Sequence, residues 1–256
     1  MRTLFAFMKK EYLETARTGK LIILVLLFAL FGIMNPALAK LTPWMMEMFS
    51  DSLVESGLIV TNVQVDAMTS WTQFFKNIPI ALIAFVLLFS DSFTKEYKSG
   101  TLLLALTKGL SRYKVVLSKT VLLLSLWTLG YGLCFSITYG YTAYFWDNSI
   151  ANHLFLAAAI WWLFGVWVIG LIVLFSSLLQ NNTGVTLCIG GTVLLAYLLR
   201  FIPQAKTFSP AVLMNTNSIL MGVEEMDAYI KAILITASMC IICVSASIPI
   251  INKRQL

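Results

Sequence analysis

The 19 residues from Leu21 to Ala39 read LIILVLLFALFGIMNPALA and contain no charged side chain. A helix rises ~1.5 Å per residue, so this segment approaches the ~30 Å thickness of the hydrocarbon core of a bilayer. Of the 256 residues in the chain, 59% are hydrophobic and only 12% are charged. A soluble domain of this size does not need so much apolar surface. The sequence therefore predicts an all-α integral membrane protein.

A second interpretation of this first segment is a secretory signal peptide, because Ala37-Leu38-Ala39 resembles an A-x-A cleavage site. The residues that precede it include Glu11 and Glu14, whereas the leading region of a signal peptide is short and cationic. We therefore expect an uncleaved first span.

Five further apolar segments follow, and together they predict six transmembrane helices in one domain that covers residues 1–256. In the second span only the stretch from Asn77 to Ser90 is free of charge, which alone suits a re-entrant segment. The span reaches full length if Lys76 extends its ammonium group to the membrane surface. The apolar part of the connector from Arg200 to Asp227 is expected to dip into the membrane without crossing it. The expected spans are residues 21–39, 72–91, 115–144, 154–179, 185–200 and 230–251.

Residues 1–20 have the pattern of an amphipathic helix that lies in the membrane interface. At 100° per residue, apolar and charged side chains fall on opposite arcs, and such a helix buries its apolar face beside the lipid headgroups. A basic leader in solvent is the alternative. The apolar arc holds Leu4, Phe5, Met8, Tyr12 and Ala16, and the charged arc holds Arg2, Lys9, Lys10, Glu14 and Arg17.

The cations of the chain lie between apolar segments rather than with aromatic residues on one polar module. With a formal net charge of +6, this distribution indicates contact with anionic lipid headgroups and not with nucleic acid. If both termini face the cytoplasm, most of the 18 Lys and Arg residues lie on the cytoplasmic side, as the positive-inside rule requires. We expect a multi-pass protein of the cell membrane with both termini in the cytoplasm.

The residues give no sign of a catalytic, metal or cofactor site in this chain. The only histidine, His153, lies at the edge of a span, and Glu224-Glu225 falls in a connector without a histidine nearby. Cys240 and Cys243 form a C-x-x-C pair inside an apolar run, where packing explains them better than redox chemistry. The chain also lacks H-E-x-x-H, G-x-S-x-G and the Walker A phosphate-binding loop. No ionisable group lies in mid-membrane, which argues against an ion-coupled carrier.

The connector of residues 94–112 concentrates more polar chemistry than any other loop. Ser99-Gly100-Thr101 predicts a turn and a helix start, and Ser111 is placed to cap the third span. The leucines between them form an apolar stripe. From the residues alone, this stripe suits either a groove on a soluble partner or the membrane surface. Its members are Leu102, Leu103, Leu106 and Leu110.

One arrangement in and beyond this connector resembles the type-2 ATP-binding cassette permease family. Glu96 is followed four residues later by Gly100-Thr101, then by the apolar helix, by Ser111-Arg112 and by Lys119 at the start of the next span. The amphipathic leader, the six spans and the short inner loops agree with that family over essentially the whole chain.

This resemblance implies that the connector is a cytoplasmic coupling helix between spans two and three, seated in a groove of a separate ATPase subunit. Leu102, Leu103 and Leu106 would then fill the groove, Gly100 and Thr101 would set the turn, and Ser111 would precede the third span. Polar contacts around the groove would come from Glu96, Arg112 and Lys114.

The resemblance further implies a permease subunit of an ATP-driven exporter, without an ATPase site of its own. ATP and Mg would be bound by the partner subunit, and a second permease copy or a related permease would complete the transporter. A hydrophobic or amphipathic substrate is expected, such as an antimicrobial peptide, a drug or a lipid. The alternatives are a membrane scaffold or peptide-sequestering immunity protein without transport activity, and a membrane-embedded enzyme.

Overall fold

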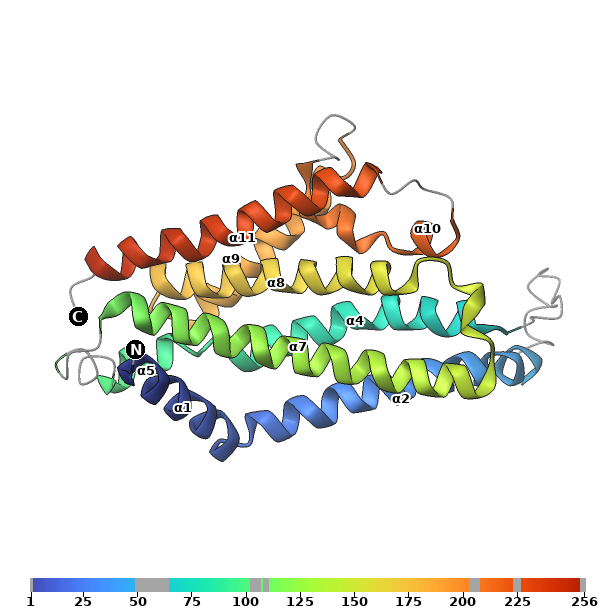
Figure 1. The fold of residues 1–256 in the computed structure, drawn as a ribbon, viewed down its shortest axis with the longest axis horizontal. Coiled ribbons are helices and arrows are strands. Elements are labelled where there is room, and N and C mark those ends of the chain that lie inside the picture. The colour runs from blue at the N-terminus through green and yellow to red at the C-terminus, as the bar shows by residue number, and fades with distance from the viewer. Residues whose placement is uncertain are drawn as a thin grey trace.

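The computed structural model describes residues 2–48, 65–101, 107, 111–202, 208–222 and 227–253. These residues are almost entirely helical and include no strand. Within them, six helices are long and apolar enough to cross a membrane (Figure 1), which confirms the expected all-α class and the number of spans. The six are α2 (Lys20–Met48), α4 (Ala67–Phe89), α7 (Arg112–Phe145), α8 (Leu154–Leu178), α9 (Asn182–Leu199) and α11 (Asp227–Lys253). The shorter helices are α1 (Arg2–Arg17), α5 (Thr94–Ser99), η1 (Asn148–Ile150), η3 (Pro210–Met214) and α10 (Asn217–Leu220).

The first two spans are longer than the sequence predicted. Helix α2 continues past Ala39 to Met48, and α4 begins at Ala67, before the expected start at residue 72. Asp66 caps α4, because its Oδ1 atom accepts a hydrogen bond of 3.0 Å from the backbone N–H of Thr69. The second span therefore has full helical length, with Lys76 exposed on its surface.

Two groups of helices make up the bundle. Helix α2 packs against α4 and α7, whereas α8 packs against α11, α9 and α7. Figure 1 shows these two groups joined along α7 and α8. Helix α8 is the central element: 67% of its most apolar window is buried, against 17% for both α9 and α11.

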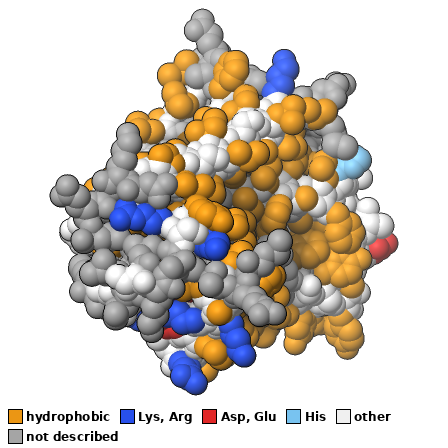
Figure 2. All heavy atoms as spheres, turned by 60° about the vertical axis from the view of Figure 1, so that its left-hand side comes forward, with side chains coloured by type: hydrophobic (Ala, Val, Ile, Leu, Met, Phe, Trp, Pro, Cys, Tyr) orange, Lys and Arg blue, Asp and Glu red, His pale blue; other side chains and the backbone are white. Residues whose placement is uncertain are grey.

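The two ends of the bundle are formed by different elements. Figure 1 shows α1, α5 and the C-terminal end of α11 together at one end, which we call the connector end. The opposite end, called the far end, carries the turn from α7 to α8 and the short helix α10. In Figure 2, where the connector end comes forward, Lys and Arg side chains gather there, and hydrophobic side chains cover much of the remaining visible surface.

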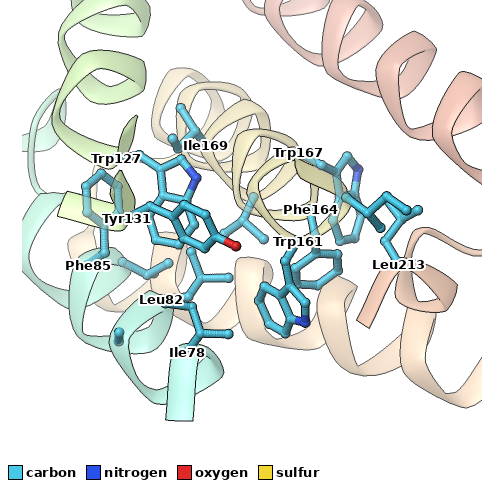
Figure 3. Packing of buried hydrophobic residues seen from close by; sticks show 14 of the residues in the cluster. Ile78, Leu82, Phe85, Trp127, Tyr131, Trp161, Phe164, Trp167, Ile169 and Leu213 are labelled. Atoms are coloured by element: carbon cyan, nitrogen blue, oxygen red, sulfur yellow. The ribbon is translucent and has the colours of Figure 1, made fainter. Parts of the chain in front are cut away.

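An aromatic core joins the two helix groups. Trp127 of α7 packs against Phe85 and Tyr131, with ring centroids 5.6 and 5.4 Å away, and its Nε1 donates to the carbonyl of Trp162 on α8 (Figure 3). Its indole ring lies directly over Gly165, where any Cβ atom would approach the ring to 2.3 Å. Glycine therefore allows the close approach of α7 and α8 at this point.

The connector between α9 and α11 also packs into the bundle. Residues Pro210 to Leu213 of η3 are buried and contact α8, α9 and α11. Figure 3 shows Leu213 beside Phe164 and Trp167 of α8. Ser209 starts η3 by accepting a hydrogen bond from the backbone N–H of Ala211. The apolar segment that was expected to dip without crossing thus folds back against the spans.

A small polar network lies among α2, α4 and α7. Pro36 removes the backbone N–H that would bond to the carbonyl of Gly32, and the hydroxyl of Thr138 donates to that carbonyl instead, at 3.1 Å. Asn35 donates to the same hydroxyl at 3.2 Å and accepts a bond of 2.8 Å from Asn77. These contacts satisfy polar groups that could not bond to water inside a membrane, and so α2 continues through its proline.

The contact between Trp127 and Gly165 yields a test of the packing. The Gly165→Ala variant should lose about 1–3 kcal/mol of unfolding free energy, because its methyl group must displace the indole ring. Gly132→Ala is the matched control, since a Cβ atom there has no neighbour within 4 Å. Thermal unfolding in detergent micelles measures both, and equal stability of the two variants would contradict this packing.

Candidate functional site: a buried ion-pair ring

The candidate site begins where α4 passes into the connector. Helix α5 follows α4 after a short turn and ends at Gly100, which adopts a left-handed conformation with φ 68°. Glycine adopts this conformation without the strain that a Cβ atom introduces. Thr101 and Thr107 are exposed. The predicted groove-filling residues Leu102, Leu103 and Leu106 lie outside the described residues, as does Leu110.

Glu96 of α5 belongs to a closed ring of alternating charges at the connector end. Lys119 of α7 approaches Glu11 of α1 at 2.8 Å and Glu96 at 3.1 Å. Lys10 of α1 approaches the other oxygen of each carboxylate, at 3.0 Å from Glu11 and 2.5 Å from Glu96. We call these four residues the ion-pair ring. It joins three helices that are far apart in the sequence.

Backbone contacts and neighbouring side chains hold the ring in place. Lys119 also donates a hydrogen bond of 2.8 Å to the carbonyl of Ser92, in the turn between α4 and α5. Phe93 of the same turn lies under the Lys119 ammonium group, 5.4 Å from it. One step away, Lys20 at the start of α2 pairs with Asp91 at 2.5 Å. The N-terminal ends of α2 and α7 are thus both fixed to this turn.

Three of the four ionisable members of the ring are buried, and the side chain of the fourth, Lys10, is 44% exposed. Glu11, Glu96 and Lys119 are only 6%, 5% and 1% exposed. Two ammonium groups face two carboxylates, so the charges balance inside the ring. Removing ions from water costs several kcal/mol each, and such a set is tolerated only when every member has partners. The ring therefore specifies how α1, α5 and α7 fit together more than it adds net stability.

The pKa shifts on α1 follow from burial and from these partners. Burial raises the pKa of Glu11, and the ammonium group of Lys119 opposes that rise. For Lys10, partial burial acts to lower the pKa, but the hydrogen bond and charge of Glu96 outweigh it and the pKa lies above its ordinary value. At the rim, burial of Glu14 is outweighed by hydrogen bonds from Lys10 and Lys95, so its pKa is lowered. Glu14 therefore remains charged at neutral pH.

Three carboxylates in this region are close enough to share a metal ion. Oxygen atoms of Glu11, Glu14 and Glu96 lie within 4.8 Å of one another. The ammonium groups of Lys10 and Lys119 already lie against these oxygens and neutralise them. The arrangement is thus that of a salt-bridge network, and it does not require a divalent ion.

The other predicted contact residues lie at the start of α7. Arg112 donates a hydrogen bond of 2.5 Å to the carbonyl of Ile251, near the C-terminal end of α11, and so links the first residue of α7 to the last span. Lys114 lies 5.9 Å from the ring of Tyr113. Ser111 stands at the N-cap position, but its side chain makes no capping hydrogen bond, which corrects that expectation.

The structure places one predicted residue in the ring together with another that was not predicted. The carboxylate of Glu96, which was expected to make polar contacts around the groove, lies against Lys10 and Lys119. Glu11 was not predicted as a site residue. On the helical wheel of α1 it lies between Phe7 and Leu4, at the edge of the apolar arc, and a carboxylate beside apolar side chains was the signal that could have identified it.

The remaining candidates from the sequence are not brought together in one cluster among the described residues. His153 precedes α8 with a positive φ of 49°, and Cys240 and Cys243 are free thiols. Glu224 and Glu225 lie outside the described residues. In the described part of the chain, the group around the ion-pair ring is the one place where three potential metal-binding side chains converge.

Removal of one charge from the ring should destabilise the protein strongly. Lys119→Met leaves two buried carboxylates facing one ammonium group, and the expected cost is about 3–5 kcal/mol of unfolding free energy. The double variant Lys119→Met with Glu11→Gln should recover a large part of this loss, because Lys10 and Glu96 then remain as a balanced pair. Denaturation in detergent measures these differences.

The control is Lys95→Met at the exposed rim, where the loss should stay within about 1 kcal/mol. If the separate costs of Lys119→Met and of Glu11→Gln simply add up in the double variant, the four charges do not act as a unit.

A profile of the ABC-2 family of transporter proteins matches residues 5–251 of the chain. The match runs from α1 through the connector to α11 and includes all four residues of the ion-pair ring. Comparisons with curated proteins and with solved structures give no significant match. Because the family profile covers nearly the whole sequence, and because six helices suited to a membrane accompany it, the chain belongs to the ABC-2 family of transporter proteins.

Proposed function

We propose that the chain is the permease subunit of an ATP-driven exporter, and that a separate ATPase subunit drives it through the connector between α4 and α7. Membership of a transporter family supports a transport role. The described spans carry no ion pair in mid-membrane, and so they offer no charged site at which an ion gradient would drive transport. Energy would therefore enter from a partner at the surface of the membrane.

The observation that carries this proposal is the ion-pair ring at the base of the connector. A partner that pushes on α5 moves Glu96, and Glu96 is bound to both Lys10 and Lys119. Separating these charges in a buried site costs on the order of several kcal/mol. Movement of the connector would consequently be passed on to α1 and α7 rather than absorbed by the loop.

The contact with the ATPase is assigned to the leucines that follow this base. Leu102, Leu103 and Leu106 would enter a groove of the ATPase, while Gly100 and Thr101 set the turn that directs them. Arg112 and Lys114 would contribute charge beside the groove. Glu96 would transmit the movement of the connector through its ion pairs with Lys10 and Lys119.

The direction of the chain in the membrane follows from the charge of its two ends. Lys and Arg side chains gather at the connector end (Figure 2), and cytoplasmic loops are the ones that carry such an excess. We assign the connector end, with both termini, to the cytoplasmic side of the cell membrane. The connector would then meet an ATPase in the compartment that holds ATP and Mg.

A second permease, either another copy or a related chain, would complete the transporter together with two ATPase subunits. ATP and Mg would be bound by the ATPase pair, and this chain would supply the transmembrane path. An apolar hollow of ≈ 260 Å³ between α7, α8 and α11 supports a hydrophobic or amphipathic substrate. Its lining includes Leu124, Ile169 and Val244, with Thr120 and Ser245 as polar members.

Disruption of the leucine stripe tests the proposed partner. A variant with Leu103→Asp and Leu106→Asp should still insert into the membrane but lose association with a protein that carries a Walker A lysine, because two carboxylates cannot enter an apolar groove. Affinity purification from the native host, followed by mass spectrometry, measures the association. The matched control, Leu103→Met with Leu106→Met, keeps the apolar surface and should retain the partner. Retained association in the aspartate variant, or transport in vesicles without any ATPase, would overturn the proposal.

A further inference from the structure

An open notch lies at the far end of α7, where the helix passes into η1. It has a volume of ≈ 560 Å³ and combines aromatic rings with one carboxylate. Figure 1 shows that this end of α7 lies away from α1 and α5. The notch is therefore separate from the ion-pair ring and from the connector. Its lining consists of Tyr139, Tyr144, Phe145, Trp146, Asp147 and Asn148, with Ala143.

Hydrogen bonds hold the polar part of the notch in a fixed geometry. Asp147 accepts one bond of 2.9 Å from the backbone N–H of Ser149 and another of 2.7 Å from its hydroxyl. Asn148 accepts a bond of 2.9 Å from the indole N–H of Trp71 and donates one of 3.4 Å to the carbonyl of Tyr139. The carboxylate and the neighbouring rings are thus positioned before any ligand arrives.

Asp147 supplies the notch with a negative charge. The backbone N–H of Ser149, and to a lesser extent its hydroxyl, donate hydrogen bonds that lower the pKa of Asp147, so the carboxyl group is ionised at neutral pH. In the part of the chain that the structure describes, no Lys or Arg pairs with this carboxylate. A positively charged ligand would therefore gain an ionic partner here.

The aromatic rings offer the second kind of interaction that cations use. Lys40 already places its ammonium group 3.8 Å from the ring centre of Phe145, which shows that a cation can lie against this surface. Tyr144, next to it, is 82% exposed and packs edge to face with Phe145, with the ring centroids 5.0 Å apart. Ring faces attract cations through their quadrupole, and tyrosine and tryptophan serve better than phenylalanine in this respect.

We propose that the notch binds an organic cation of the trimethylammonium type. Such a group has diffuse charge and methyl surface, so it can contact several rings and still lie beside a carboxylate. A primary ammonium group is compact and more strongly hydrated, so it gains less on leaving water for the ring faces. The inference concerns binding alone and stands whether or not the chain exports a substrate.

The trimethylammonium group belongs either to the choline headgroup of a neighbouring lipid or to a soluble cation.

To separate the effect of charge from that of shape, we would compare the binding of choline with that of 3,3-dimethyl-1-butanol, in which carbon replaces the quaternary nitrogen. Saturation-transfer NMR on the full chain in uncharged maltoside micelles measures both ligands. Choline should bind at least 10-fold more tightly than the neutral analogue, and equal binding of the two would overturn the proposal.

Two variants locate the binding in the notch. Asp147→Asn keeps a side chain that can still accept from Ser149 but removes the charge, and Tyr144→Leu keeps apolar surface but removes a ring. Each should weaken choline binding at least 5-fold. Tyr113→Leu is the control, because Tyr113 is 49% exposed at the opposite end of α7, and binding should not change. Unchanged binding in both notch variants would place the site elsewhere and refute the assignment.

A final arm identifies the source of the cation. Nanodiscs of phosphatidylglycerol would be compared with nanodiscs that also contain phosphatidylcholine. If the lipid headgroup occupies the notch, phosphatidylcholine will displace soluble choline from the native chain but make no difference in the Asp147→Asn variant. If the ligand is a soluble cation, choline binding will be the same in both. Either result supports the site, whereas loss of charge selectivity in both kinds of nanodisc would contradict it.

Discussion

Two ammonium groups and two carboxylates meet at the connector end of the bundle, where Lys119 and both carboxylates are buried and Lys10 closes the ring from the partly exposed side. Each ion lies against two of opposite sign, so removal of any one leaves a buried charge short of a partner. The positions of α1, α5 and α7 depend on this constraint, because every one of these helices contributes at least one charge. A loop on a membrane protein thereby gains a rigid base.

The same requirement, that no polar group be left unpaired away from water, explains the interior of the spans. Pro36 interrupts the backbone hydrogen bonds of α2, and the hydroxyl of Thr138 from α7 restores the lost contact at Gly32. Asn35 and Asn77 extend that contact to α4. Polar atoms in the membrane-spanning region thus act as links between helices, and they hold α2, α4 and α7 together as one unit.

The sequence predicted the number of spans because bilayer thickness and hydrophobicity alone set it. It did not predict the length of α2, since Pro36, Pro43 and Lys40 suggest a helix end, and the carbonyl of Gly32 finds its donor in Thr138, 106 residues away in the chain. In the candidate site, too, local features could be predicted and long-range contacts could not. Glu96 and Lys119 belong to a local sequence pattern, but Glu11 is recognised as part of the site only through its contact with Lys119, which lies 108 residues further on.

The indole of Trp127 has one more consequence. It is fully buried, lies over Gly165 and donates its N–H to a carbonyl of the adjacent helix. If α7 and α8 separated during a working cycle, water would reach this indole and its emission would shift to longer wavelength. Of the seven tryptophans in the chain, Trp127 is therefore an intrinsic fluorophore at the contact between α7 and α8, and a variant that keeps it as the sole tryptophan would report their opening without an attached dye.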